Sequence, residues 1–90
     1  MFDEKIIING IRKACDKDTK AYKITEYYLA LTSGSLDDGG INLATSRILS
    51  IEEELRQWVK KHPNNRTNIM QSEESALCLI DDLRKKNLLN

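Results

Sequence analysis

The sequence predicts an all-α fold, a compact bundle or array of three to four short helices. Three observations lead to this prediction. Apolar residues recur at helical spacing along most of the chain, turn-rich stretches at 32–40 and 62–67 separate these patterns, and acidic residues precede basic ones in most segments. A chain of 90 residues is the size of one domain, so we expect a single helical domain over 1–90.

The clearest predicted helix spans 41–61. Its apolar residues follow the spacing 3-4-3-4-3 of a helical stripe: Ile41, Ala44, Ile48, Ile51, Leu55 and Trp58. Three more apolar residues widen that side: Leu43, Leu49 and Val59. The charged residues between them fit a solvated face, among them Glu52, Glu53 and Arg56. We expect the helix to end before Pro63, because the residue that precedes a proline disfavours helical geometry.

A second helix is expected over 18–33, with Asp18 as its N-cap and Gly34 just beyond its end. Its apolar face consists of Ala21, Ile24, Tyr28 and Leu31. A C-terminal helix is expected to begin at Ser72 as its cap, and an earlier start near 69–70 is the alternative. Its apolar stripe consists of Ala76, Leu77, Ile80 and Leu83.

The N-terminal segment has two interpretations. A helix over 2–15 fits the apolar positions and the acid-first, base-last order. A hairpin turning at Asn9-Gly10 fits the same residues. Because a two-stranded hairpin needs a partner sheet and no later segment supplies strands, we favour the helix, with a kink or break near 16–18.

Composition excludes several functional classes. The net charge is zero, whereas nucleic-acid binders usually carry a basic excess. No run of 18 apolar residues is present, so no membrane span is expected. Acidic residues stand where a signal peptide needs bases, which favours a cytoplasmic protein. Cys15 and Cys78 lack metal-type spacing, and we expect buried thiols rather than a disulfide.

No residue pattern indicates catalysis. The single histidine, His62, fits the end of a helix, where the dipole favours it. Cys15 has Arg12 and Lys13 nearby but at the C-terminal end of a helix, and Cys78 lies in an apolar run, so neither has the surroundings of a reactive thiolate. A calcium loop counted from Asp16 fails at Ala21 and Tyr27, where glycine and glutamate are needed. We therefore expect no enzymatic activity, no metal site and no cofactor.

Aromatic residues outside the core stripe suggest a protein interface. Tyr22 and Tyr27 lie off the apolar face that contains Tyr28, and exposed tyrosine is enriched at interfaces. The candidate partner-binding residues are Tyr22, Tyr27, Glu52, Glu53, Arg56 and Trp58. The long stripe over 41–58 suits either the central helix of a monomer or the seam of a dimer.

Nucleic-acid binding is the alternative hypothesis. Its candidate contacts are Arg47, Lys60, Lys61, Arg66, Arg84, Lys85 and Lys86. Residues 44–49 have the small polar residues and arginine of a recognition helix, but 34–40 form too long a turn for a helix-turn-helix motif. Glu53 and Glu54 would also lie close to the phosphates. This alternative is therefore the weaker one.

The expected function is a small helical protein-interaction module that acts by binding a partner protein. Inhibitors, immunity or anti-defence factors, adaptors and chaperones of bacteria or phages are often small, charge-balanced helical proteins of this kind. That expectation rests on the protein class and not on a site. A protein partner is expected, and a homo-oligomer is left open.

Overall fold

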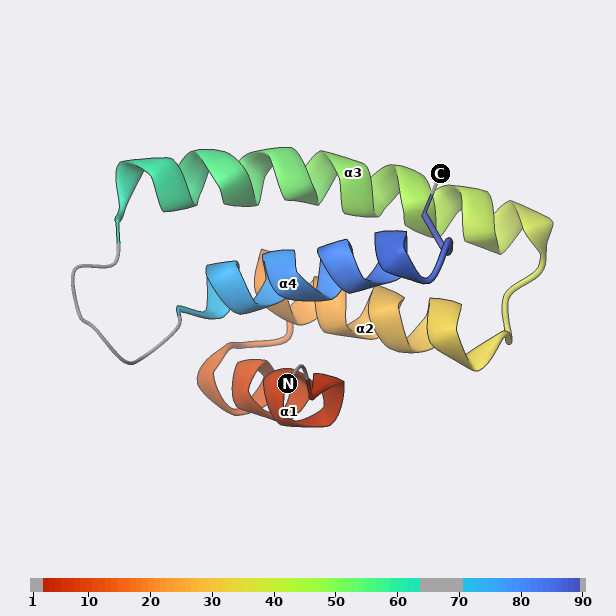
Figure 1. Ribbon diagram of the computed structural model, residues 1–90, viewed down its shortest axis with the longest axis horizontal. Coiled ribbons are helices and arrows are strands. Elements are labelled where there is room, and N and C mark those ends of the chain that lie inside the picture. The colour runs from red at the N-terminus through yellow and green to blue at the C-terminus, as the bar shows by residue number, and fades with distance from the viewer. Residues whose placement is uncertain (1–2, 64–70, 90) are drawn as a thin grey trace.

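The computed structural model describes residues 3–63 and 71–89 of the chain. They form four helices and no strand: α1 (Glu4–Ala14), α2 (Lys20–Ser33), α3 (Asp38–Lys61) and α4 (Ser72–Lys85) (Figure 1). The predicted all-α bundle is therefore confirmed. The radius of gyration, 12.8 Å, is close to the roughly 12 Å of a compact chain of this length.

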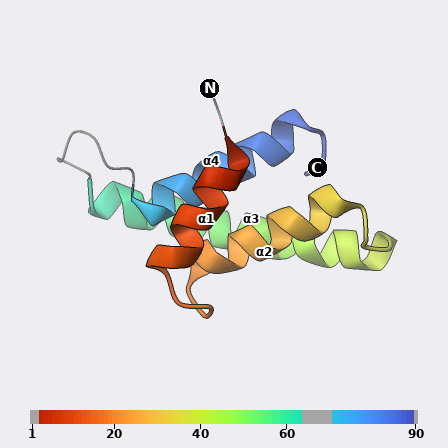
Figure 2. The same cartoon turned by 90° about the horizontal axis from the view of Figure 1, so that it is seen from below.

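The helices pack in three layers. α2 and α4 lie side by side in the middle, α3 covers one side of this pair, and α1 covers the other (Figure 1). α1 and α3 make no contact with each other, and α1 crosses the middle pair steeply (Figure 2). α3 has 24 residues and runs along the long axis of the molecule, which measures 41 Å. One face of α3 therefore packs on the middle pair and the other faces solvent.

The core lies between these layers and follows the predicted helix faces. All four predicted residues of the α2 face are buried, and so are Ala44, Ile48 and Leu55 of the long stripe. The other three stripe residues, Ile41, Ile51 and Trp58, are half-buried. The stripe therefore packs within the monomer, as one interpretation predicted, but α3 is an outer helix and not the central one. Leu79 on α4 is fully buried but was missing from the predicted stripe. Leu79 is buried because α4 contacts all three other helices, so a wider part of its surface faces the core than a single stripe covers.

The N-terminal segment is a helix and not a hairpin. The Asp3 carboxylate caps α1 by accepting hydrogen bonds from the backbone N–H groups of Lys5 at 3.1 Å and Ile6 at 3.4 Å. Ile8 and Ile11 then reach the core from one face of α1. Residues 15–19 are not helical, so α1 and α2 are separate helices, in agreement with the predicted break near 16–18.

Two predicted N-caps are wrong by one residue. α2 is capped by Thr19 and not by Asp18, because the Thr19 hydroxyl accepts from the Tyr22 N–H at 3.4 Å. α4 has Gln71 at the cap position and not Ser72, and the Gln71 N–H donates to Glu74 Oε1 at 3.4 Å. The alternative start of this helix at 69–70 lies outside the described residues.

α3 begins earlier than predicted. The sequence indicated a loop through residue 40, because two glycines disfavour a helix. The helix nevertheless starts at Asp38, since the Asp37 carboxylate accepts from the Gly40 N–H at 2.7 Å and its carbonyl accepts from the Ile41 N–H at 2.8 Å. The loop is thereby reduced to residues 34–37, where Gly34 ends α2 with a left-handed φ of 70°.

Three side chains of α3 differ from their expected placement. Glu52 was expected on the solvated face but is only 6% exposed, because it lies against α4 in an ion-pair network. Leu43 and Leu49 were expected to widen the packed side, yet they are 55% and 38% exposed. The packed face of α3 is therefore rotated away from both leucines and toward Glu52.

Candidate protein-interaction groove

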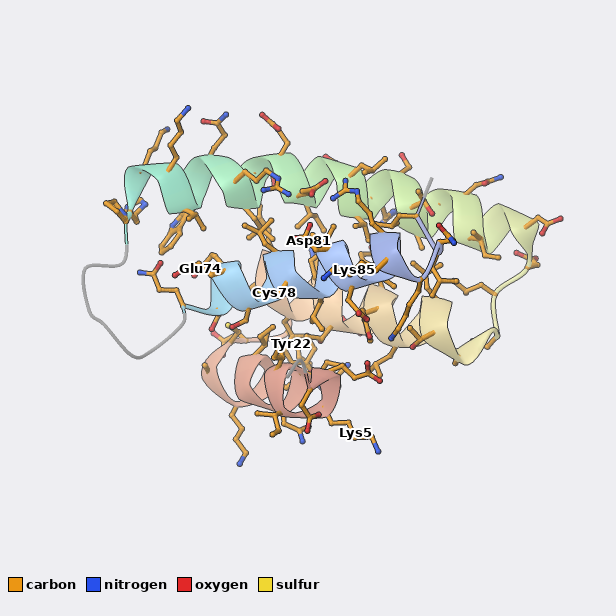
Figure 3. All side chains as sticks on the ribbon, viewed as in Figure 1. Lys5, Tyr22, Glu74, Cys78, Asp81 and Lys85 are labelled. Carbon is orange, nitrogen blue, oxygen red and sulfur yellow. The ribbon has the colours of Figure 1, made fainter. Side chains whose placement is uncertain are left out.

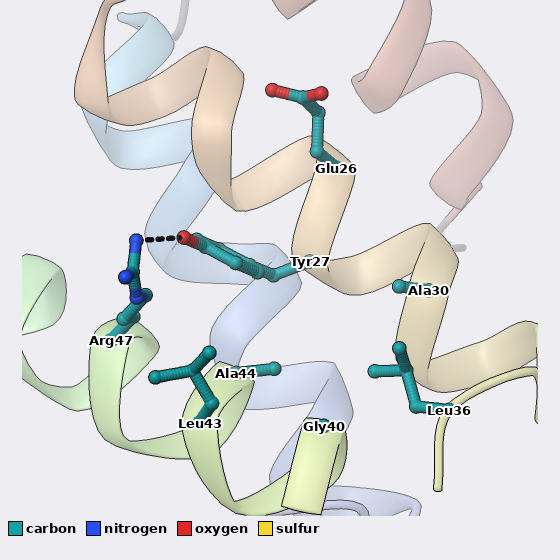
Figure 4. A pocket seen from close by; sticks show the side chains of 8 residues that line it. All are labelled: Glu26, Tyr27, Ala30, Leu36, Gly40, Leu43, Ala44 and Arg47. Atoms are coloured by element: carbon teal, nitrogen blue, oxygen red, sulfur yellow. Dashed lines mark hydrogen bonds between the residues drawn. The ribbon is translucent and has the colours of Figure 1, made fainter.

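A groove of about 400 Å³ lies between α2 and α3 on the surface of the bundle (Figure 4). Its lining residues come from α2, from the connecting loop and from the first turns of α3: Glu26, Tyr27, Ala30, Leu36, Gly40, Leu43, Ala44 and Arg47. Most of the lining is apolar, and the two formal charges are of opposite sign. We call this feature the α2–α3 groove.

Helical periodicity explains how these residues come together. On α3, Gly40, Leu43, Ala44 and Arg47 are spaced i, i+3, i+4 and i+7, so they share one face. On α2, Tyr27 and Ala30 are one turn apart. Three of these residues, Ala30, Gly40 and Ala44, are small, which leaves the space between the helices hollow. Small residues also allow another helix to approach closely.

Leu36 closes one end of the groove and fixes the path of the loop. A Cβ atom added at Gly40 would lie 3.3 Å from Leu36 Cδ2 and 3.1 Å from Asp37 Oδ1. The absence of a side chain at Gly40 thus lets the loop fold tightly over the first turn of α3. The N-cap of α3 and this end of the groove therefore depend on the same glycine.

Tyr27 and Arg47 form the other end of the groove. The Arg47 guanidinium donates to the Tyr27 hydroxyl at 3.5 Å, across the space between α3 and α2 (Figure 4). The tyrosine is half-buried and lies beside the apolar core, whereas the arginine is exposed. Tyrosine and arginine are both among the residue types enriched at the positions that dominate binding in protein interfaces.

Leu43 is the most exposed apolar residue of the groove. Single exposed leucines are common on protein surfaces, and Leu49 on the same helix is an example that lies outside the α2–α3 groove. Leu43 differs because it stands at the edge of a concave apolar surface. An apolar side chain beside a hollow is the arrangement that a docking partner covers.

Of the six predicted partner-binding residues, only Tyr27 belongs to this groove. Tyr22 packs toward α1, where Arg12 donates to its hydroxyl at 3.4 Å and its guanidinium carbon lies 4.8 Å from the ring centre (Figure 3). Trp58 stacks on His62 with ring centres 4.4 Å apart. Glu53 is exposed and accepts from Gln57 at 3.3 Å.

The other two predicted partner-binding residues, Glu52 and Arg56, join a network between α3 and α4. Arg84 holds the Glu52 carboxylate with two hydrogen bonds of 2.6 and 2.5 Å, and Arg56 adds a third at 2.8 Å. Hydrogen bonding from Arg84 outweighs burial and holds the pKa of Glu52 below its usual value. The Glu52 carboxylate is thus engaged inside the bundle and does not face a partner.

A second polar cluster joins α1, α2 and α4. The Tyr28 hydroxyl donates to Asp82 Oδ2 at 2.6 Å, accepts from Lys86 Nζ at 2.8 Å, and lies 2.9 Å from Glu4 Oε2. Burial and the hydrogen bond to Asp82 raise the pKa of Tyr28. Burial alone would raise the pKa of Asp82, but hydrogen bonds from Lys86 and Tyr28 outweigh it and lower that pKa. This cluster holds three helix surfaces together.

The predicted nucleic-acid contacts do not gather on one surface. Arg84 and Lys86 are used in the two networks, and Arg66 lies outside the described residues. Lys60 and Lys61 end α3, while Lys85 ends α4, which runs antiparallel to α3, so Lys85 lies well away from the last turn of α3 (Figures 1 and 3). Arg47 is part of the groove. The six of these cations that the structure describes do not form the continuous basic surface that tracks a phosphate backbone.

Potential catalytic groups are likewise dispersed. His62 Nδ1 lies 3.0 Å from the Trp58 carbonyl oxygen at the end of α3. Cys15 and Cys78 form no disulfide and are half-buried rather than buried, and burial raises the pKa of the Cys78 thiol. Within residues 3–63 and 71–89, no three histidine, cysteine or acidic side chains are placed to hold a metal ion. None of the four helices is long and apolar enough to cross a membrane.

Comparison of the chain with protein-family models, with curated proteins and with solved structures gave no match. The function proposed below therefore rests on the geometry of the α2–α3 groove alone.

Proposed function

We propose that this protein is a helical protein-interaction module whose docking surface is the α2–α3 groove. The observation that carries the proposal is the position of Leu43, which is exposed at the rim of an apolar hollow with a floor of small residues. Helix-in-groove recognition places apolar side chains of one helix into such a hollow. Binding of this kind requires no catalytic group.

The energetics favour a few strong contacts over a large surface. Burying a whole leucine side chain contributes about 1.5–3 kcal/mol, and more than half of Leu43 is still available for burial. Tyr27 is half-buried against the apolar core, so its further ordering costs little on binding. Leu43 and Tyr27 are therefore the proposed anchors of the interface.

Occlusion or clamping of a partner is the mode of action that follows from such a surface. A protein that only binds can block another protein's active site or hold two proteins together, as inhibitors, immunity factors and adaptors do. The proposal is made at the level of this class.

The test compares the wild-type chain with Leu43→Glu and Leu49→Glu as baits for affinity capture from cells that express the protein. Both variants place a carboxylate at an exposed leucine of α3, but only Leu43 lines the groove. Each protein recovered is then purified and titrated against all three baits. A partner that binds the wild type and Leu49→Glu equally, and Leu43→Glu at least about tenfold more weakly, supports the proposal. Partners that do not distinguish the two variants would contradict it.

A further inference from the structure

We propose that the α2–α3 groove is occupied by a second copy of this chain, so that two copies pair about a twofold axis through the groove. This inference rests on the proposed function, because it names the partner of the same surface. In a twofold interface the same patch serves both copies, and a residue that contacts a second residue across the interface is contacted by it in return. A surface used in this way must therefore be complementary to itself.

The charges of the groove meet this condition. Glu26 lies on the α2 wall and Arg47 on the α3 wall, and Figure 4 shows the Arg47 guanidinium directed at the Tyr27 hydroxyl and not at the Glu26 carboxylate. Among the described residues neither one has a partner of opposite charge: Glu26 forms no ion pair, and Arg47 bonds only the Tyr27 hydroxyl. A twofold operation that places Glu26 of one copy against Arg47 of the other forms this pair twice.

The contrast with Arg56 and Arg84 strengthens the point. Arg56 and Arg84 each bind carboxylates within the chain. Arg47 is the arginine of α3 whose guanidinium is left for a carboxylate from outside. A carboxylate in the matching position of the same groove, Glu26, supplies that partner.

The shape of the groove is complementary to itself as well. Leu43 protrudes from the rim, while Ala30 and Ala44 leave the floor hollow. Two copies related by a twofold axis can each place Leu43 over the small residues of the other. A chain with zero net charge also imposes no long-range repulsion between copies.

The area that a stable dimer must bury indicates how far the interface extends beyond the groove. A stable dimer buries about 800 Å² per partner, which exceeds the groove itself. The adjoining exposed faces of α2 and α3 must take part, so in the proposed pair the α2–α3 face of one copy packs on the same face of the other. α1 lies on the far side of the bundle and stays outside this interface.

The first test is the molecular mass of the full chain in solution, measured by sedimentation equilibrium over a range of concentrations. The wild type and the matched control Leu49→Glu are expected to form dimers. Leu43→Glu is expected to raise the dissociation constant at least about tenfold, because it places a carboxylate where Leu43 would cover the small residues of the other copy. A wild type that stays monomeric at every concentration, or a dimer that Leu43→Glu leaves unchanged, would overturn the inference.

The second test uses charge reversal and needs no assumption about the strength of the dimer. Glu26→Arg alone sets two arginines against each other at both symmetric positions, and Arg47→Glu alone sets two glutamates against each other. Each variant is therefore expected to dimerise at least about tenfold more weakly than the wild type. An equimolar mixture of the two variants restores both attractive pairs, so it is expected to form a heterodimer of wild-type strength.

Circular dichroism of each variant separates loss of pairing from loss of folding. A mixture no stronger than its components contradicts the pairing of Glu26 with Arg47 and so the proposed dimer. A chain that is monomeric, yet captures another protein through Leu43 in the affinity experiment, overturns the second-copy inference and leaves the proposed function intact. A chain that is monomeric and captures no protein through Leu43 contradicts both the second-copy inference and the proposed function.

Discussion

Arg84 on α4 holds the buried carboxylate of Glu52 on α3 through both arms of its guanidinium, at 2.6 and 2.5 Å. A paired, planar contact of this kind fixes geometry as well as charge. Glu52 is 6% exposed, whereas Arg84 is partly in solvent. The two partners therefore differ in what their removal leaves behind: loss of Arg84 leaves a buried carboxylate, and loss of Glu52 leaves an arginine that water can solvate.

Arg84→Met is expected to destabilise the fold by about 2–3 kcal/mol, because the buried Glu52 carboxylate loses two charge-assisted hydrogen bonds. Glu52→Gln is expected to cost about 1 kcal/mol, since the remaining arginines stay hydrated. Urea unfolding of both variants measures this difference. In the double variant the cost should fall well short of the sum, and strict additivity would show that the two residues do not interact.

Acid is expected to destabilise the fold through Glu52 and Asp82. Both pKa values are lower in the folded chain than their ordinary values near 4, so folding favours the ionised forms. Their contribution to stability is complete above that range and is lost as the pH falls through the folded values. Urea midpoints measured from pH 7 to pH 3 should therefore decline below about pH 4.5. Glu52→Gln should decline less steeply, and an equal slope in that variant would exclude Glu52 from the effect.

Tyr28→Phe is expected to loosen α1 from the bundle. The substitution keeps the buried ring but removes the hydroxyl shared by Asp82, Lys86 and Glu4, at a cost of about 1–3 kcal/mol. Hydrogen exchange should accelerate in α1 more than in α3, which does not contact α1. Tyr22→Phe is the control, because its hydroxyl accepts one longer bond of 3.4 Å. Equal acceleration in both variants would contradict a special role of the Tyr28 cluster.

Gly39→Ala and Gly40→Ala are expected to have different effects although they are neighbours in the first turn of α3. Alanine favours a helix over glycine by about 1 kcal/mol. A Cβ at Gly39 has its nearest neighbour at 3.7 Å, so this variant should gain stability. A Cβ at Gly40 lies 3.1 Å from the Asp37 oxygen that caps the helix, so the gain is offset by a displaced cap. Thermal unfolding measures both, and a Gly40→Ala protein as stable as Gly39→Ala would show that the cap moves freely.

The sequence was sufficient to predict the helical class and most of the core, because periodicity reports which side of a helix is buried. The α2 face of Tyr28 and its apolar neighbours is an example. It was not sufficient for Glu52, whose burial depends on Arg84, a residue 32 positions away. No pattern within one helix reports a partner at that distance. The first turn of α3 was not predicted, because Gly39 and Gly40 indicated a loop. The hydrogen bond from the Gly40 N–H to the Asp37 carboxylate, which caps the helix there, cannot be seen in the sequence.

The groove was only partly predictable for the same reason. Tyr27 was identified as an aromatic residue off the core face, but Leu43 was assigned to the packed side of α3. A signal was present in the spacing of Gly40, Leu43, Ala44 and Arg47, which is a helical face adjacent to the main stripe. Its partial exposure follows from where α2 and α4 pack on the adjacent face of α3, and that position is a property of the fold.

Site-specific photo-crosslinking inside the cell tests the α2–α3 groove most directly. A photoreactive amino acid is placed at position 43, and in a separate chain at position 49, and the crosslinked products are identified by mass spectrometry. We predict a discrete crosslinked species from position 43, either to a second copy of the chain or to another protein, and little from position 49. Equal crosslinking from both positions, or none from position 43, would contradict a docking role for the groove.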